Sequence, residues 1–139
     1  MGPKDSSPER ALILDSSAIL AAMLAEPSAG QVLERLDAAF SIGIASPTLV
    51  EAAIVLSSRL GKDARPRLNE FLREAEVEIV PFGPGHVDAA IDAFMRYGKG
   101  RHPASLNFGD CLTYAAAAVA ALPLLFTGND FSKTDIEAA

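Results

Sequence analysis

Short apolar runs that alternate with amphipathic stretches predict an α/β fold with a mainly parallel sheet. Residues 11–14, 41–45 and 124–126 form such runs, and a helix start or a turn signal follows each of them. Runs of this length are typical of strands that are buried on both faces of a parallel sheet. Hydrophobic residues make up 50% of the 139-residue chain, which is enough to bury the core of one globular domain. Strands that alternate with helices along the chain then favour parallel pairing.

Local signals define the elements of the first half of the chain. The first strand ends at Asp15, after which Ser16 or Ser17 can cap a helix. Ser46 is a suitable N-cap, because a proline follows it at a position that favours the first helical turn, and Gly61 ends this helix. The strands expected here cover residues 11–14 and 41–45, and the helices cover residues 16–25, 27–39 and 46–60.

The second half of the chain continues the alternation. Residues 76–81 alternate acidic and apolar side chains, which is typical of an edge strand. The glycine- and proline-containing segment 98–103 is expected to be a loop. Asn107 or Ser105 can cap the alanine-rich helix that follows it. The remaining helices are expected over residues 64–74, 85–97 and 107–121, and the last strand over residues 124–126.

The composition excludes several kinds of site and location. A single cysteine rules out a disulfide framework, and two distant histidines are a poor basis for a metal site. The 12 basic and 18 acidic residues give a net charge of −6, which argues against nonspecific electrostatic binding of nucleic acid by the whole surface. Asp15 interrupts the first long apolar run and Pro123 the last, so neither run is expected to be a signal peptide or a membrane span. We expect a cytoplasmic protein with a loose leader over residues 1–10 and one domain over residues 11–139.

Four acidic residues fall where expected strands end and the following helices begin: Asp15, Glu51, Asp110 and Asp130. Sites in parallel sheets form at this edge. Each aspartate has an ordinary alternative role as a helix cap or as a favourable charge at a helix start. Glu51 lies in a segment that is apolar on nearly every face, so we expect it to be mostly buried. Because an unpaired buried carboxylate is costly, Asp15 and Glu51 together suggest a shared cation.

The chemistry of these side chains indicates which cation they would share. Carboxylate oxygens suit Mg²⁺ or Mn²⁺, whereas zinc sites favour histidine and cysteine. Mg²⁺ keeps several water ligands and bridges to phosphate groups. An all-carboxylate cluster is therefore typical of a site that cleaves phosphodiesters, in which the metal neutralises phosphoryl charge and activates a water.

Four blocks of the sequence resemble the signatures of PIN-domain ribonucleases, and more narrowly those of VapC toxins from bacterial type II toxin–antitoxin pairs. The blocks are residues 12–18 (LILDSSA), 46–51 (SPTLVE), 106–111 (LNFGDC) and 124–131 (LLFTGNDF). The resemblance covers about residues 11–136, and the order and spacing of the blocks make it far more specific than any single block. It implies a three-layer α/β/α sandwich with a parallel sheet.

The resemblance also implies roles for individual residues. The three acids expected to bind Mg²⁺ or Mn²⁺ and to position the attacking water are Asp15, Glu51 and Asp110. The fourth acid corresponds most naturally to Asp130. Asp135 is the alternative, because many relatives carry this acid two residues earlier, where this chain has Gly128. Ser16 matches a position whose hydroxyl supports the site.

Partners follow from the resemblance and from a few basic residues. The candidates for RNA phosphate contacts are Arg96, Lys99 and Arg101, for which a solvated surface loop is the ordinary alternative. The resemblance implies an RNA substrate and a VapB antitoxin. The antitoxin's C-terminal segment would cover the active-site groove, and its N-terminal part would bind operator DNA. It also implies a homodimer, for which the apolar helices of residues 27–60 offer a surface.

Two other classes of function stay open on the sequence. A degenerate PIN fold would act only as a non-catalytic binding module, and metal-dependent cleavage of RNA would decide between the two. A phosphoacceptor receiver domain also clusters acidic residues on a small α/β fold. That class needs a lysine after a late strand, where this chain has Thr127 and Gly128.

Overall fold

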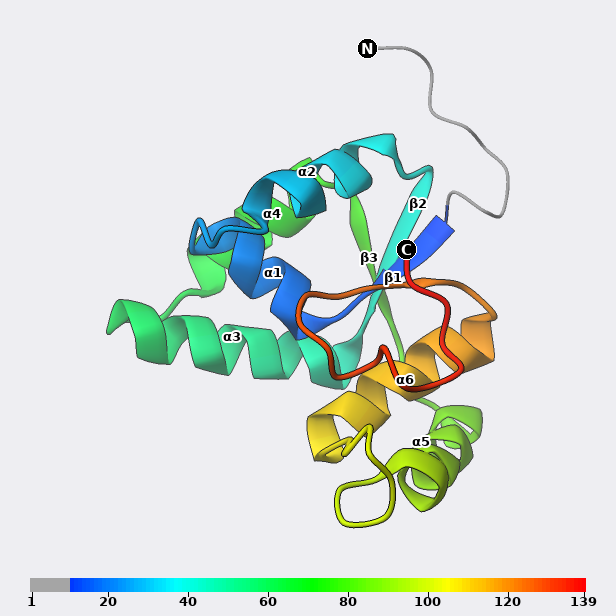
Figure 1. Cartoon of the computed structure of the whole chain (residues 1–139). Coiled ribbons are helices and arrows are strands. Elements are labelled where there is room, and N and C mark those ends of the chain that lie inside the picture. The colour runs from blue at the N-terminus through cyan, green and yellow to red at the C-terminus, as the bar shows by residue number, and fades with distance from the viewer. Residues whose placement is uncertain (1–10) are drawn as a thin grey trace.

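The computed structural model describes residues 11–139, and the leader expected over residues 1–10 lies outside them. Within residues 11–139 the chain forms four strands and six helices (Figure 1). The strands are β1 (Ala11–Leu14), β2 (Ser41–Ala45), β3 (Val77–Val80) and β4 (Leu124–Leu125). The helices are α1 (Ser16–Met23), α2 (Ala29–Ala38), α3 (Ser46–Leu60), α4 (Arg65–Glu74), α5 (Pro84–Tyr97) and α6 (Phe108–Ala120).

The strands form one sheet in the order β3-β2-β1-β4, and every pairing is parallel. The register pairs Leu12 with Ile42 and Ile13 with Leu124, so β1 lies between β2 and β4. β3 is an edge strand, as its alternating acidic and apolar residues predict. The parallel α/β fold expected from the sequence is confirmed. Because all strands run the same way, their carboxyl ends share one edge of the sheet, where sites form in such folds.

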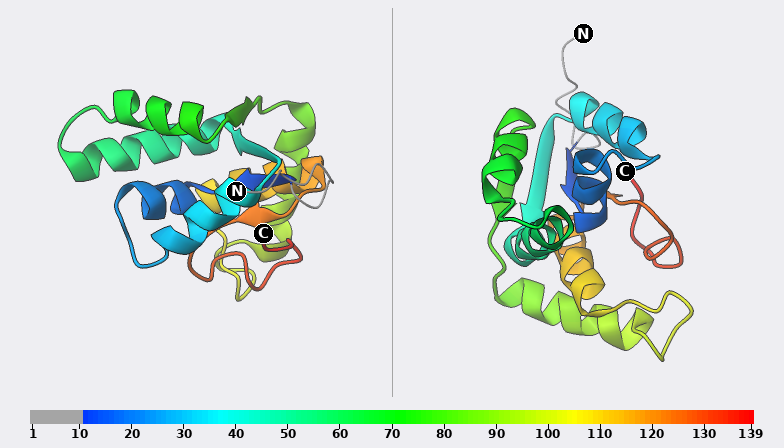
Figure 2. Two further views of the ribbon diagram at one scale, coloured as in Figure 1. Left: turned by 90° about the horizontal axis from the view of Figure 1, so that it is seen from above. Right: turned by 90° about the vertical axis from the view of Figure 1, so that its left-hand side faces the viewer.

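The side chains of β1 separate two cores, one on each face of the sheet. Leu12 and Leu14 belong to a core that they share with residues of α1, α2, α3 and α4. Ile13 belongs to the other core, which contains residues of α5 and α6. Figure 1 and Figure 2 show the resulting three layers, with α3 and α4 extending beyond the sheet. No helix of residues 11–139 has the length and apolar character needed to cross a membrane.

The N-cap residues of two helices differ from those expected. Asp15, rather than a serine, is the N-cap of α1, and its carboxylate accepts a hydrogen bond from the Ser17 backbone N–H at 3.1 Å. Ala45 occupies the N-cap position of α3 without a side-chain hydrogen bond, so Ser46 is already helical. In both places the strand passes almost directly into the helix, and the residue at the end of the strand takes the capping position.

Candidate active site

Four acidic side chains gather at the carboxyl edge of the sheet. Asp15 follows β1, Glu51 lies in the second turn of α3, Asp110 lies in the first turn of α6, and Asp130 lies in the loop after β4. The pKa of Asp110 is raised to about 6, chiefly by burial and further by the charges of the other three residues. Those charges act on Asp110 because the four side chains converge. We refer to these four residues as the acidic cluster.

Asp15 and Asp110 are held by the backbones of the helices that they begin. Asp15 is 7% exposed, and its Oδ2 atom accepts the capping hydrogen bond from Ser17. Asp110 Oδ2 accepts a hydrogen bond from the Asn107 N–H at 3.0 Å, and Asn107 Oδ1 accepts one from the Asp110 N–H at 2.9 Å. This reciprocal pair is a capping box, so Asn107 and not Ser105 caps α6. Among residues 11–139 neither aspartate has a hydrogen-bond partner for its other oxygen, so a capping role leaves room for a ligand role.

The expectation that Glu51 is mostly buried is wrong, because the residue is exposed. Only one side of α3 packs on the core, and its residues Val50 and Ile54 are 57% and 61% exposed. The Ser16 hydroxyl donates a hydrogen bond to Glu51 Oε1 at 3.2 Å, which holds this carboxylate near the start of α1. The argument that a cation offsets the cost of burying carboxylates therefore applies to Asp15 and Asp110, which are the less exposed members of the acidic cluster.

Gly109 is a site residue that the sequence analysis did not single out. It is the second residue of α6, and a Cβ atom there would lie 2.9 Å from Oε2 and 3.0 Å from Oε1 of Glu51. Cβ atoms do not approach other atoms so closely, so glycine lets the start of α6 lie against the Glu51 carboxylate. The signal in the sequence is a glycine at the start of an alanine-rich helix, where alanine would have the higher helix propensity.

A buried pair of hydroxyls joins the two helices that carry Glu51 and Asp110. Thr48 and Thr113 are 2% and 0% exposed, and their Oγ1 atoms lie 2.9 Å apart. Thr48 precedes Glu51 by about one helical turn, and Thr113 follows Asp110 by about one turn. The hydrogen bond therefore sets the spacing of α3 and α6 next to the acidic cluster.

Two other residues singled out from the sequence lie close to one another. Arg96 Nη1 is 3.6 Å from Oδ2 of Asp135, and the Tyr114 hydroxyl donates a short hydrogen bond to Oδ1 of the same carboxylate. No motif in the sequence pointed to Tyr114. Lys99 and Arg101 are exposed in the loop between α5 and α6. Their expected contact with RNA stays a prediction.

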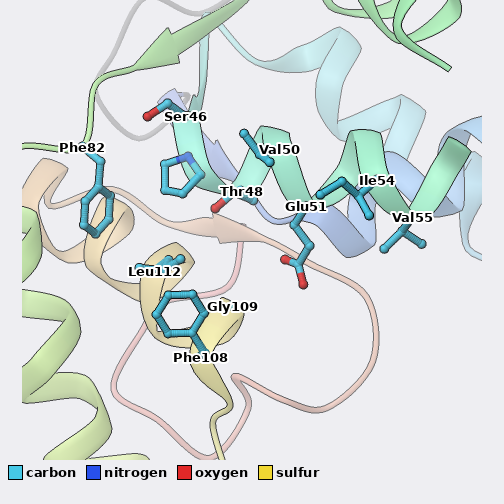
Figure 3. Close-up of a pocket in the computed structure, with 11 residues that line it drawn as sticks. Ser46, Thr48, Val50, Glu51, Ile54, Val55, Phe82, Phe108, Gly109 and Leu112 are labelled. Atoms are coloured by element: carbon cyan, nitrogen blue, oxygen red, sulfur yellow. The ribbon is translucent and has the colours of Figure 1, made fainter. Parts of the chain in front are cut away.

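An apolar groove of about 680 Å³ lies beside the acidic cluster, between α3 and α6 (Figure 3). Figure 3 shows Val50 and Ile54 on the α3 side, Phe108 on the α6 side, and Glu51 pointing from α3 toward α6. Phe108 is 79% exposed. The residues that line the groove are Ser46, Pro47, Thr48, Val50, Glu51, Ile54, Val55, Phe82, Phe108, Gly109 and Leu112. A concave surface lined mostly by apolar side chains is typical of a binding site.

The donor atoms of the acidic cluster suit a hard divalent cation. Its members offer only carboxylate oxygens, which Mg²⁺ and Mn²⁺ prefer. A cation would also relieve the repulsion that contributes to the raised pKa of Asp110. Within residues 11–139 no three acidic, histidine or cysteine side chains are close enough to hold one ion as they stand. The exposed carboxylates of Glu51 and Asp130 would therefore have to rotate inward to share it.

Comparison with known proteins gives a family match and close relatives. Residues 12–137 match the PIN domain family. Ribonuclease VapC36 of Mycobacterium tuberculosis is 44% identical over 127 residues, which cover 91% of each chain. Ribonuclease VapC of Mycolicibacterium smegmatis is 41% identical over 128 residues, which cover 91% of this chain and 98% of the relative.

Two solved structures share the fold at lower identity. Mycobacterium tuberculosis VapC20, described as a sarcin–ricin loop cleaving toxin, is similar with a TM-score of 0.73 at 17% identity, over 92% of this chain and 98% of that one. A toxin–antitoxin complex from Klebsiella pneumoniae gives a TM-score of 0.66 at 17% identity, over 89% and 92% of the two chains. At this identity the two structures support the fold, including its three layers.

Proposed function

Because the chain belongs to the VapC family of PIN-domain ribonucleases, we propose that its acidic cluster is the catalytic centre that hydrolyses RNA. VapC proteins are the ribonuclease toxins of VapBC toxin–antitoxin systems, and PIN-domain ribonucleases typically depend on metal ions. In this proposal Asp15, Glu51 and Asp110 hold Mg²⁺ or Mn²⁺, and Asp130 is the fourth acid. The observation that carries it is the position of the four carboxylates at one edge of the sheet, where Ser16 holds Glu51 beside the start of α1 and Gly109 lets the start of α6 lie against it. Burial and the neighbouring charges accordingly raise the pKa of Asp110 to about 6.

The family match removes one of the alternatives considered from the sequence. A PIN domain over residues 12–137 spans all four acids of the cluster and contradicts a phosphoacceptor receiver domain. A non-catalytic binding module differs from the proposal only in whether the acidic cluster is active. Cleavage of RNA separates these two.

The residues of the site each have a task in phosphodiester hydrolysis, in which a water oxygen bonds to phosphorus and one ester oxygen leaves. When bound, the metal ion neutralises phosphoryl charge and makes a bound water more acidic. Helix caps fix the carboxylates of Asp15 and Asp110. Ser16 orients Glu51 through its 3.2 Å hydrogen bond, and Gly109 keeps the space beside Glu51 free of a side chain. These contacts limit the rearrangement that substrate and metal binding require.

Cleavage of a structured RNA by the purified, antitoxin-free protein tests the proposal. We expect activity with Mg²⁺ or Mn²⁺, loss of activity in EDTA, and recovery when the ion is restored. Asp15→Asn is expected to abolish cleavage, whereas Asp88→Asn, on the exposed surface of α5, is a control expected to stay active. Robust cleavage in EDTA, or better recovery with Zn²⁺ than with Mn²⁺, would contradict the proposal. A folded protein that binds RNA but does not cleave it, whichever metal ion is added, would favour the binding module.

The apolar groove is the proposed docking site for a VapB-type antitoxin. Its walls are mostly apolar and Glu51 of the acidic cluster is one of the residues that line it, so it fits a segment with apolar anchors and a basic side chain. In a cytoplasmic VapBC pair the antitoxin would also bind operator DNA, while the toxin forms a homodimer through the helices of residues 27–60. Ile54→Asp in the groove should weaken antitoxin binding. Ile79→Asp, at a residue that is 51% exposed on β3, should not.

A further inference from the structure

The loop after β4 carries Asp130 to the edge of the sheet. This C-terminal loop, residues 126–137, is drawn in orange to red in Figure 1. The Thr127 N–H donates a hydrogen bond to Ser17 Oγ at 3.0 Å, which ties the beginning of the loop to α1. Phe131 anchors its middle and is 1% exposed. Asp130 itself is exposed, so its position depends on how the loop around it is held.

A polar contact attaches the far end of the C-terminal loop to both α5 and α6. The Tyr114 hydroxyl of α6 donates to Asp135 Oδ1, and Arg96 Nη1 of α5 lies 3.6 Å from Asp135 Oδ2. Arg96 Nη2 donates to the Tyr97 hydroxyl at 2.9 Å, and the guanidinium lies 4.8 Å from the centre of the Tyr97 ring. Burial and the hydrogen bond to Asp135 raise the pKa of Tyr114, so its hydroxyl keeps the proton that it donates. We term Arg96, Tyr114 and Asp135 the latch.

The latch lies about one helical turn from the acidic cluster. Tyr114 follows Asp110 by four residues in α6, so the two side chains lie on the same side of that helix. Asp130 and Asp135 belong to the same short loop, and Asp130 lies between its two attachments, the hydrogen bond from Thr127 to Ser17 and the hydrogen bond from Tyr114 to Asp135. The latch therefore holds the loop to α6 on one side of Asp130, as the contact of Thr127 with Ser17 holds it to α1 on the other.

We propose that the latch is a positioning device that keeps Asp130 beside Asp110. The proposal rests on the function proposed above, in which Asp130 is the fourth acid. It assigns Asp135 a role that differs from that of a metal ligand, since both of its carboxylate oxygens are engaged by Tyr114 and Arg96. It likewise assigns Arg96 to the protein's own loop rather than to RNA. No latch residue touches the reacting atoms.

A double-mutant cycle between Tyr114 and Asp130 tests the proposal on the full chain with saturating Mg²⁺. Tyr114→Phe removes the hydroxyl and keeps the ring. We expect about a tenfold fall in kcat with the KM for RNA unchanged, because the fourth acid is misplaced while substrate contacts remain. Asp130→Asn lowers kcat at least as much, and adding Tyr114→Phe to it should cause no further loss. Asp135→Ala, at a side chain that is 54% exposed, repeats the test at a position where folding is not at risk.

The outcomes separate this proposal from the proposed function. An equal fall in kcat on adding Tyr114→Phe to wild type and to Asp130→Asn would show that the latch does not act through Asp130, and would overturn it. Full kcat in both Tyr114→Phe and Asp135→Ala would do the same. Ser132→Ala, which removes a 2.8 Å hydrogen bond to the Asn129 carbonyl within the loop, is the control expected to keep wild-type kcat. A comparable loss there would attribute the effect to loop order in general and contradict the latch. Activity that survives Asp15→Asn would instead overturn the proposed function itself.

Discussion

Asp15 and Asp110 each combine two roles that sequence patterns present as alternatives. One oxygen of each carboxylate caps a helix. Asp15 does so as the N-cap of α1, a role that contributes roughly 0.5–2 kcal/mol to stability, and Asp110 as the second member of the capping box with Asn107. The same hydrogen bond restricts the side-chain rotamer, so the second oxygen is presented from a fixed position. At the edge of a parallel sheet, where helices begin, a carboxylate can therefore stabilise the fold and serve the site at once.

Asp110→Asn is expected to separate these roles through the pH dependence of stability. The pKa of Asp110 is raised from 3.8 to about 6, so the folded state holds this proton more tightly than the unfolded state. The stability that this provides is present below about pH 3.8 and is lost as pH rises to about 6. Asparagine cannot ionise and can still accept the hydrogen bond from Asn107. Without metal, the free energy of unfolding of the variant should therefore match that of wild type near pH 4. At pH 7 it should be higher by roughly 1 kcal/mol, a value reduced to allow for screening of this partly exposed group by solvent.

Denaturant unfolding in EDTA and in Mg²⁺ checks this prediction. The free energy of unfolding of wild type should rise by roughly 2.7 kcal/mol at a hundredfold excess of Mg²⁺ over its dissociation constant, and that of the variant should rise by less. RNA cleavage should also be lost. A purely capping role predicts the opposite, because removal of a favourable charge in the first helical turn costs about 0.3–1 kcal/mol. A destabilised Asp110→Asn protein with an undiminished response to Mg²⁺ would refute a metal role for this residue.

Gly109→Ala is expected to lower activity without lowering stability by a comparable amount. The added methyl group would lie 2.9 Å from the Glu51 carboxylate, which must move away. Because Glu51 is exposed, it can move at little energetic cost, and alanine has a higher helix propensity than glycine. Gly85→Ala is the matched control, since Gly85 is also the second residue of a helix and a Cβ atom there meets nothing within 4 Å. Equal cleavage rates for the two variants would contradict the role of Gly109.

At the scale of elements, the order of strands and helices follows from signals that lie within a few residues of one another. Apolar runs, prolines at helix starts and the Asn107 cap predict nearly every element, because these preferences are local. The exposure of Glu51 is not predictable in the same way. Its helix is apolar on nearly every face, and only the packed structure decides that Val50 and Ile54 line a groove instead of a core. The contact of Tyr114 with Asp135 also joins distant segments and has no local signal.

The Thr48–Thr113 pair provides a prediction about how α3 and α6 are joined. Thr113→Val keeps the shape of the side chain but leaves the buried Thr48 hydroxyl without its partner, which costs roughly 1–3 kcal/mol. Changing both residues to valine removes both polar groups and should be nearly neutral relative to wild type. Free energies of unfolding for the two single variants and the double variant measure this coupling. Additive losses would show that the two hydroxyls do not stabilise each other.

At the scale of the whole molecule, the charge distribution has to be reconciled with an RNA substrate. The chain carries a net charge of −6 and an acidic cluster, so its long-range field repels RNA. Binding therefore depends on short-range contacts with a few cations. Lys99 and Arg101 are exposed in the loop between α5 and α6, whereas Arg65 is committed to Asp63 at 2.6 Å.

Replacing Lys99 and Arg101 by alanine is expected to weaken RNA binding and to flatten its dependence on salt. Each lost phosphate contact should reduce the slope of log K against log [salt] by about one unit. The measurement uses the Asp15→Asn background, so that RNA is bound without being cleaved. Lys62→Ala/Arg67→Ala is the matched control, because both positions are exposed and both double variants change the net charge from −6 by the same two units, to −8. An equal change of slope in the two double variants would mean that only net charge matters. An unchanged slope in the Lys99→Ala/Arg101→Ala variant would mean that these two residues are solvated and do not contact RNA phosphates.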